Sequence, residues 1–345
     1  MQAVVYRGRD DLRVETLPVP KIRAGELLVR VAVCGVCPTD IKKIHYGTVP
    51  PPRVFGHETA GTVVKIGAGV KKFRVGDRVG LHHHIPCMTC HYCKHRAFAQ
   101  CAGYKRTGIT AGFEPAGGGY AEYVRVMPFV LGGVVKIPAR NSFLEGAMLE
   151  PVNTVLKGVR RLNILKGDSV MVIGQGPIGL MFTKLLKLRG IKVLATDLMD
   201  SRLKLAKKWG ASKTFRADDP KLAKKIRAIA PSLDAAVVAV PVDAAVQQAM
   251  ELVRGSGQIL LFAHTKPGDK AATELSSICM LEKDLIGSYS ADYTLQKEVA
   301  RLVFSRQIDM RQLVTHKFSL AQTAVAVALA SRPTADSLKI IVNQG

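Results

Sequence analysis

The chain has 345 residues, of which 48% are hydrophobic and 22% charged, and its formal net charge is +23. This length leaves room for two domains, because a single hydrophobic core seldom grows beyond roughly 250–300 residues. The apolar runs are shorter than the roughly 20 residues that span a bilayer, and the N-terminus lacks the pattern of a signal peptide. We therefore expect a cytoplasmic protein with no membrane partner.

The positive charge raises the question of a nucleic-acid partner. The basic residues occur as scattered pairs such as Lys42-Lys43, Lys71-Lys72 and Lys207-Lys208, and the chain has no long basic tail. A nucleic-acid-binding protein concentrates its charge on one face or stripe. The scatter favours solvated surface lysines, so we expect no nucleic acid, and a basic zinc-binding protein that holds nucleic acid stays as the remote alternative.

The first 150 residues are β-rich, with short apolar runs broken by Gly and Pro. A short helix is predicted over Pro38–Tyr46, after the first of these runs. The predicted strands are ELLVRVAV (26–33), AGTVVKIG (60–67) and DRVGL (77–81).

From about residue 150 strands and helices alternate, which predicts parallel β-α-β units. The predicted strands are 168–174, 192–197, 234–240 and 258–264, and the predicted helices are 176–190, 201–210, 221–230 and 243–253. The tail after about residue 287 adds helices over 295–306 and 320–330 and a strand over 338–342.

The strongest local motif is a run of four cysteines, Cys87-x2-Cys90-x2-Cys93-x7-Cys101. In a cytosolic chain such spacing favours metal over disulfides, and four thiolates satisfy the tetrahedron of a structural zinc with no open position. An iron–sulfur cluster and four reduced, unliganded cysteines are the alternatives. The nearby histidines, His82, His83, His84, His91 and His95, are interpreted as surface residues because the cysteines already fill the site.

A glycine-rich motif, Gly174-Gln175-Gly176-Pro177-Ile178-Gly179, follows a predicted strand and opens a helix. In that context it indicates a dinucleotide site, since the glycines let the backbone approach a pyrophosphate at a helix N-terminus. Asp197 ends the next strand, where a carboxylate can bind ribose hydroxyls and repel a 2′-phosphate, which favours NAD over NADP. Arg202 lies close enough to stack on adenine or to meet a phosphate. An unliganded structural turn is the alternative.

Three scattered motifs, Cys37-Pro38-Thr39-Asp40, Gly56-His57-Glu58 and Glu150-Pro151, are unremarkable singly. Together they offer a thiolate, an imidazole and two carboxylates, and three protein ligands with one open position is the usual arrangement of catalytic zinc.

In order and spacing, these motifs resemble the zinc-containing medium-chain alcohol dehydrogenases over essentially the whole chain. Glu150, at a position where the alcohol dehydrogenases themselves carry a cysteine, resembles the branch of sorbitol and other polyol dehydrogenases and threonine dehydrogenase. The resemblance implies an α/β protein with a GroES-like β-barrel catalytic domain and a Rossmann domain with a doubly wound parallel sheet. The catalytic domain would comprise residues 1–150 and 287–345, with a structural zinc lobe at about 84–104, and the NAD-binding domain residues 151–286.

The same resemblance implies two zinc ions per chain and hydride transfer between NAD and a secondary alcohol, a polyol or an amino alcohol such as threonine. Cys37 and His57 would bind the catalytic zinc, and Glu58 and Glu150 would share the third position, with the direct ligand left open. Cys87, Cys90, Cys93 and Cys101 would hold the structural zinc. Thr39 would begin the proton relay.

One position departs from the family pattern. Many relatives carry a histidine five residues after the catalytic cysteine, where this chain has Lys42, and the nearest histidine is His45. Either His45 or a chain of ribose and water would complete the relay. A simple alcohol, a sugar or a phosphorylated polyol would fit the same zinc site as substrate. The alternative of a zinc-free reductase of the superfamily would have no need of Cys37, His57 and Glu150. The resemblance also implies a homodimer or a homotetramer.

Overall fold

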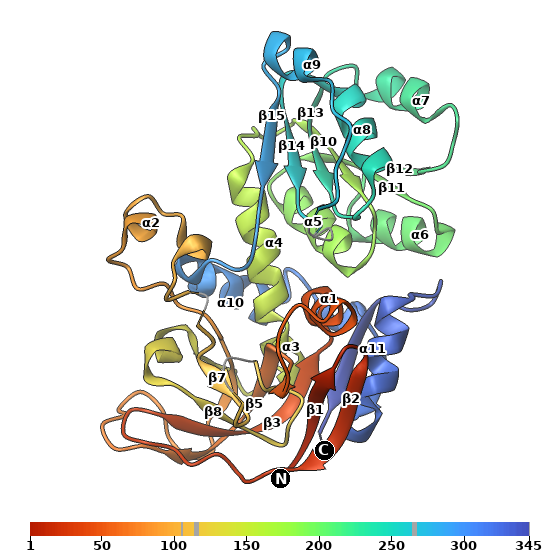
Figure 1. Ribbon diagram of the computed structural model, residues 1–345. Coiled ribbons are helices and arrows are strands. Elements are labelled where there is room, and N and C mark those ends of the chain that lie inside the picture. Colours follow the sequence, from red (N-terminus) through yellow and green to blue (C-terminus); the bar gives the residue numbers. More distant parts are fainter. Residues whose placement is uncertain (105, 114–116, 264–267, 345) are drawn as a thin grey trace. The chain divides into compact units, whose positions relative to one another are not determined.

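The computed structural model describes residues 1–104, 106–113, 117–263 and 268–344 (Figure 1). The chain forms two compact units, one made of Met1–Asn153 with Ala291–Gly345 and the other of Thr154–Ser290. The corresponding boundaries predicted from the sequence are 150 and 287. None of the described helices combines the length and the apolar character that crossing a membrane requires.

Two sheets build the first unit, within the described residues. The larger contains β16 (Val314–Ser319), β17 (Lys339–Asn343), β3 (Leu27–Gly35), β5 (Glu58–Ile66), β6 (Arg78–Gly80) and β9 (Val135–Lys136) in that order, with β8 (Tyr123–Val126) on β3 and β7 (Ile109–Thr110) on β8. The smaller contains β2 (Asp11–Thr16), β1 (Gln2–Gly8) and β4 (Arg53–Val54). The helices are α1 (Pro38–Tyr46), α2 (His91–Lys94), α3 (Phe143–Ala147), α10 (Gln296–Phe304) and α11 (Thr323–Ser331).

The core of this unit follows the two-residue period of its strands. Leu27, Val29 and Val31 of β3 are at most 2% exposed and pack with Val63 of β5 in one apolar cluster. Burial of each such side chain stabilises the fold by about 1.5–3 kcal/mol. Strand β3 ends at Gly35 and β5 begins at Glu58, and these two residues are paired in the sheet. The segments that carry Cys37 and His57 therefore lie side by side at the same end of the two strands.

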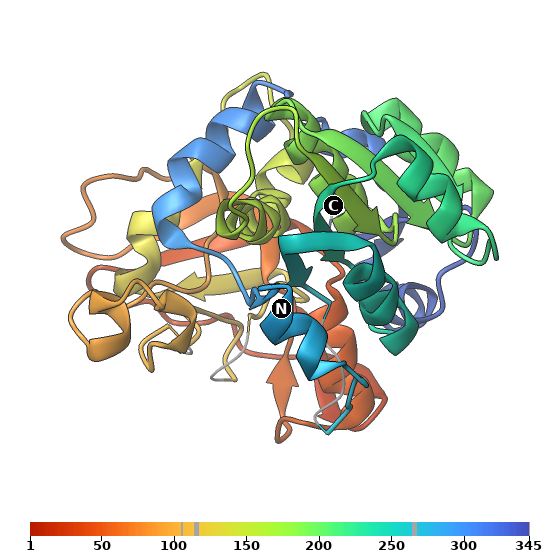
Figure 2. The same cartoon turned by 90° about the horizontal axis from the view of Figure 1, so that it is seen from above.

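A lobe with its own small core lies between β6 and β7. It contains α2 and a 3-10 turn at Phe98–Gln100, and Figures 1 and 2 show it as the orange excursion from this unit. Its buried residues are Cys93, Phe98, Ala99, Cys101 and Tyr104. The Tyr104 hydroxyl donates to the carbonyl of Ala291 at 2.6 Å, which fastens the lobe to the C-terminal segment of the same unit.

The second unit contains a parallel six-stranded sheet in the described residues. The order is β12 (Lys213–Arg216), β11 (Lys192–Asp197), β10 (Ser169–Ile173), β13 (Leu233–Val238), β14 (Val253–Leu261) and β15 (Asp284–Gly287), which is strand order 3-2-1-4-5-6. That order defines the Rossmann fold, whose ligand lies where the order reverses, between β10 and β13.

Helices pack on both faces of this sheet. Met171 and Ile173 of β10 join the apolar cluster that includes Leu222 and Ile226, whereas Phe182 lies beside Gly158 on another helix. The helices are α4 (Leu149–Arg161), which crosses the boundary between the units, α5 (Pro177–Leu188), α6 (Asp200–Trp209), α7 (Leu222–Ile229), α8 (Asp243–Leu252) and α9 (Leu275–Met280).

Candidate metal and dinucleotide sites

The first candidate site begins at the N-terminus of α1. Cys37 is the extended N-cap residue, and Pro38 fixes the first helical position, where a missing N–H costs nothing. Asp40 therefore turns inward from the first turn of the helix and is 2% exposed. Its carboxylate accepts the Gly56 N–H at 3.2 Å and lies 3.1 Å from His57 Nδ1 through both oxygens.

This contact orients His57. Burial opposes protonation of the ring, but the charge of Asp40 and the neighbouring Cys37 side chain outweigh it and raise the pKa of His57 well above its usual value. A carboxylate on one ring nitrogen is the usual outer partner of a metal-binding histidine, because it fixes the tautomer and leaves the other nitrogen for the metal.

Glu150 enters the same place from the first turn of α4. It is 5% exposed, and burial, reinforced by the charge of Glu58, raises its pKa to about 7. The ligand atoms of His57, His83 and Glu150 all lie within 4.8 Å of one another, and Cys37 is a hydrogen-bonding neighbour of His57. The structure thus brings His57 and Glu150 together, adds His83, which the sequence analysis did not assign to the site, and places Cys37 beside His57.

These donors fit a metal ion. A carboxylate and two imidazoles face one another out of water, the half-buried Cys37 thiol lies beside His57, and Nδ1 of His83 is buried with no hydrogen-bond partner. Imidazole, thiolate and carboxylate are the donor types that hold zinc, and a bound cation would offset the cost of burying the two anionic groups.

Glu58 is paired with Lys339. Its carboxylate accepts a hydrogen bond from Lys339 Nζ at 2.7 Å through Oε1, and Oε2 is 2.5 Å from the same nitrogen. Both residues are at most 5% exposed, and Lys339 also donates to the Val36 carbonyl at 2.9 Å. This ion pair is absent from the sequence analysis, which left Glu58 and Glu150 as equal candidates.

Replacement of Lys339 by Met tests this pair, because it leaves the buried Glu58 charge without compensation. We expect Lys339→Met to lower the free energy of unfolding by about 3–5 kcal/mol, and Lys339→Met with Glu58→Gln to recover most of the loss. Denaturant unfolding of the two variants measures both values. Equal stability of the single and double variants would show that the pair carries no coupling.

The histidine run at 82–84 differs from its prediction. His82 is fully buried and His83 is 7% exposed, so neither is a surface residue. The reason is that the segment continues the path of β6: the Leu81 N–H donates to the Thr59 carbonyl at 2.9 Å, which keeps the chain beside β5. His84 is half-buried, while His91 and His95 are exposed as expected.

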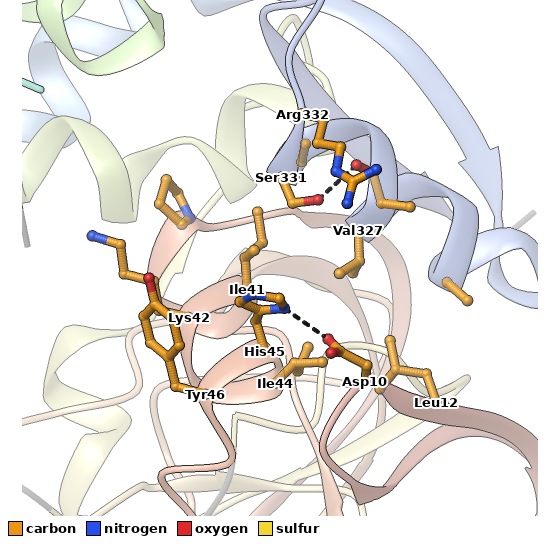
Figure 3. Close-up of a pocket in the computed structure, with 14 residues that line it drawn as sticks. Asp10, Leu12, Ile41, Lys42, Ile44, His45, Tyr46, Val327, Ser331 and Arg332 are labelled. Carbon is orange, nitrogen blue, oxygen red and sulfur yellow. Dashed lines mark hydrogen bonds and ion pairs between the residues drawn. The ribbon is translucent and has the colours of Figure 1, made fainter. Parts of the chain in front are cut away.

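His45, the predicted outer relay, has other neighbours. Its Nδ1 lies 3.1 Å from Asp10 Oδ1, and its side chain is 54% exposed. It lines a pocket of about 720 Å³ between α1 and α11, shown in Figure 3, together with Lys42, Tyr46 and Arg332. Neither Cys37 nor His57 lines this pocket, so the role of His45 as a proton relay stays a prediction.

The four cysteines of the lobe form the second candidate metal site. Their sulfurs are separated by 3.6 Å (Cys90 to Cys93), 3.6 Å (Cys101 to Cys87) and 3.9 Å (Cys87 to Cys93). Four sulfurs at about 2.3 Å from a tetrahedral zinc would be about 3.8 Å apart, whereas a disulfide needs about 2.05 Å. The sulfurs therefore fit a tetrahedral ion.

Two hydrogen-bond donors support the thiolate form of Cys87. Cys87 Sγ accepts from the Thr89 hydroxyl at 3.5 Å and from the Cys90 N–H at 3.4 Å. With Thr89 as the largest contribution, these bonds lower the pKa of Cys87 to about 5. Thiolate is the form that binds metal.

The glycine-rich loop follows β10 in the second unit. Gly174 has φ of +88°, and a Cβ there would lie 2.4 Å from Val240, so only glycine fits. A Cβ on Gly179 would lie 1.7 Å from the Gly174 carbonyl oxygen, which lets α5 start against the strand. Gly176 is the N-cap residue of α5, Pro177 begins the helix and Ile178 follows it half-buried.

Asp197 holds this loop. Its Oδ2 accepts the Gln175 N–H at 2.6 Å, and its Oδ1 accepts the Met199 N–H at 2.9 Å. The Arg202 guanidinium approaches Gly176, since it lies 4.0 Å from where a Cβ on that glycine would be. The loop, the carboxylate and the arginine thus lie together, and the free N–H groups at the start of α5 fit a pyrophosphate.

Comparison with known proteins identifies matching families and relatives. The model of the alcohol dehydrogenase GroES-like domain matches residues 23–139, and that of the zinc-binding dehydrogenases matches residues 177–305. The sorbitol dehydrogenase of Bombyx mori is 30% identical over 353 residues, which cover 99% of this chain and 98% of that protein.

Solved structures share the fold over the full length. A protein from Sinorhizobium meliloti 1021 described as a zinc-binding dehydrogenase, solved with NADP, superposes with a TM-score of 0.88 at 26% identity, covering 99% of this chain and 98% of that one. Galactitol-1-phosphate dehydrogenase from Escherichia coli has a TM-score of 0.86 at 26% identity and covers 99% of this chain and 100% of its own.

Proposed function

Because the chain belongs to the zinc-containing medium-chain alcohol dehydrogenase family, in its polyol branch, we propose that it oxidises a secondary alcohol or polyol with NAD at the site formed by Cys37, His57 and Glu150. The observation that supports this proposal is the buried cluster of His57, Glu150 and His83, which come from separate segments, with the Cys37 side chain beside His57. A simple alcohol or a sugar as substrate is the alternative. A nucleic-acid-binding protein would need neither this cluster nor the dinucleotide loop.

We assign the metal ligands from the contacts. Cys37, His57 and Glu150 would hold the catalytic zinc, while Lys339 holds Glu58 in an ion pair beside them. Bound there, zinc acts as a Lewis acid that lowers the pKa of an alcohol oxygen and polarises a carbonyl in the reverse direction. The four cysteines of the lobe would hold the structural zinc.

The residues around the site then have separate tasks. Asp40 accepts the Nδ1 proton of His57 and keeps the ring in the tautomer that leaves Nε2 free for the metal. Thr39, one residue earlier on the helix, would take the substrate hydroxyl proton on its Oγ1 and pass it to water. The loop from Gly174 to Gly179 would hold NAD, which supplies the hydride acceptor when bound.

We propose that the Asp197 carboxylate binds the hydroxyl groups of the adenosine ribose. We expect Asp197→Ala to weaken NAD binding about 10–100-fold, because hydrogen bonds to a charged group contribute about 1.5–3 kcal/mol, and to weaken NADP binding less. Titrations of both cofactors measure the ratio of the two dissociation constants, which general damage to the loop would not move. Asp200→Ala, at an exposed site on the next helix, is the matched control. An unchanged ratio would mean that Asp197 does not select the cofactor.

Lys43 bears on the class of substrate. Its charge acts on Asp40, His83 and His84, so its ammonium group lies within electrostatic range of the proposed metal site. A cation there would favour a substrate with an anionic group, which keeps a phosphorylated polyol among the candidates.

A substrate screen tests the proposed function. Purified, zinc-loaded protein is mixed with NAD or NADP and a panel of polyols, phosphorylated polyols, threonine, sugars and simple alcohols, and NADH absorbance is followed with and without a chelator. We expect chelator-sensitive reduction with one substrate class. Silence across the panel from protein that carries two zinc ions would overturn the substrate assignment.

We also infer a homo-oligomer in the cytoplasm. Leu275 and Met280 of α9, its C-cap residue Leu281 and Leu285 of β15 are 75%, 81%, 47% and 37% exposed, in that order. Among the described residues β15 is an edge strand of the sheet, and an apolar edge favours association with a second copy. Light scattering decides between monomer, dimer and tetramer. The seven cysteines are all free, which suits a reducing compartment, and fractionation of cells tests the location.

A further inference from the structure

His83 lies opposite His57 because of strand register. In the antiparallel pair β5–β6, Ala60 faces Gly80 and Gly61 faces Val79. The bond from the Leu81 N–H to the Thr59 carbonyl continues that register by one step. Two further residues along each chain, the same register places His83 across from His57, and their ring centroids are 4.8 Å apart.

The ring of His83 is buried, and one of its nitrogens lacks a hydrogen-bond partner among the described residues. The residue is 7% exposed. Its Nδ1 is buried without a hydrogen-bond partner. A buried ring nitrogen without a partner has lost its hydrogen bond to water, and a bound cation or ligand would compensate for that loss.

The two neighbouring histidines do not share this position. His82 packs against Gly133 and near Tyr293, with its ring centroid 6.4 Å from that of Tyr293. His84 Nδ1 lies 3.0 Å from the Arg106 carbonyl oxygen. Of the three, only His83 has a ligand atom within 4.8 Å of those of His57 and Glu150.

These distances allow one shared ion. Two nitrogen or oxygen donors at about 2.0–2.1 Å from a tetrahedral zinc are about 3.4 Å apart, so a cluster no wider than 4.8 Å needs only small inward shifts of its side chains. Cys37, beside His57, is the remaining donor. The site therefore offers four protein donors, whereas catalytic zinc usually has three and an open position.

We propose that His83 is a fourth protein ligand of the catalytic metal, which closes the site in the absence of substrate. This inference rests on the proposed function and adds to it a ligand that must leave when an alcohol oxygen binds. His83 is the donor suited to leave, because Asp40 secures His57 from behind, whereas the described residues provide no hydrogen bond to the ring of His83.

Metal binding tests the proposal without reference to turnover. Protein whose catalytic site has been emptied, with the four-cysteine site still loaded, is titrated with zinc against a chromophoric chelator. We expect His83→Phe and His83→Gln to weaken this site by about 10–100-fold or more, at least the effect of losing an outer partner of a ligand. His84→Gln, the adjacent histidine outside the cluster, should bind as the unaltered protein does.

A second measurement needs no variant. Co²⁺ is placed in the catalytic site of the unaltered protein, and pulsed electron paramagnetic resonance counts the coordinated imidazoles, with two expected and one of them lost when a substrate alcohol is added. A single imidazole, or zinc affinity unchanged in both His83 variants, would overturn the proposal. Neither result depends on NADH formation, so failure of the proposed function would appear separately, as silence in the substrate screen.

Discussion

Replacement of Cys37 by Ser or of His57 by Ala should reduce turnover by at least about 10³-fold, because loss of a ligand must exceed the 10–100-fold effect of losing one outer partner of a ligand. His57 belongs to the buried cluster, just before β5, and Cys37 lies beside it at the N-cap of α1. Steady-state kinetics at saturating substrate and NAD, with metal analysis of the same samples, measures the effect.

NADH binding should survive in both variants. The glycine-rich loop and Asp197 lie in the second unit, and the hydrogen bonds from Asp197 to Gln175 and Met199 are made within it. Fluorescence titration with NADH should therefore give a dissociation constant within about two- to threefold of that of the unaltered protein, because substitutions at distant sites act nearly independently. Cys279→Ser, a replacement of an exposed cysteine in that second unit, is the matched control. Normal turnover in purified Cys37→Ser would remove this cysteine from the active site.

Local signals explain which elements were predicted well. The helix over Pro38–Tyr46 has the predicted bounds, because a proline opens it and Gly47, in a left-handed conformation, closes it. The strand, glycine turn and helix from Ser169 to Leu188 were predicted for the same reason, since each boundary has its own residue type. The family resemblance supplied the rest of the fold, and the domain models and full-length relatives confirm it.

The residues that sequence reasoning missed depend on distant partners. Lys339 is 281 residues from Glu58, and nothing near either residue announces the pair. Helix α4 was not predicted, because the Glu150-Pro151 step interrupts an apolar pattern that continues into the next unit. The position of His83 could have been derived from the register of β5 against β6, but that register is fixed only once both strands and the turn between them are placed.

The second substitution for which we expect a large effect is the loss of a cysteine in the four-cysteine lobe. Beyond the cysteines themselves, its apolar cluster contains only Phe98, Ala99 and Tyr104 among the described buried residues. So small a core does not hold a segment of this length, and small folded segments of this kind depend on a metal or on disulfides. The four sulfurs at tetrahedral separation are thus the main support of the lobe.

We therefore expect Cys90→Ser to lose one zinc per chain and to lower the melting temperature by roughly 5–10 °C, the shift that a loss of about 2–4 kcal/mol produces in a domain of 150–250 residues. Substrate choice and KM should change little, because Cys37, His57 and Glu150 lie outside the lobe. Calorimetry with metal analysis measures both effects, and metal analysis of the unaltered protein also separates zinc from an iron–sulfur cluster. His95→Gln, at an exposed site in the same lobe, should keep two zinc ions and the original melting temperature. A Cys90→Ser protein with one zinc and undiminished stability would contradict a structural role, since the lobe would then fold on its few apolar contacts alone.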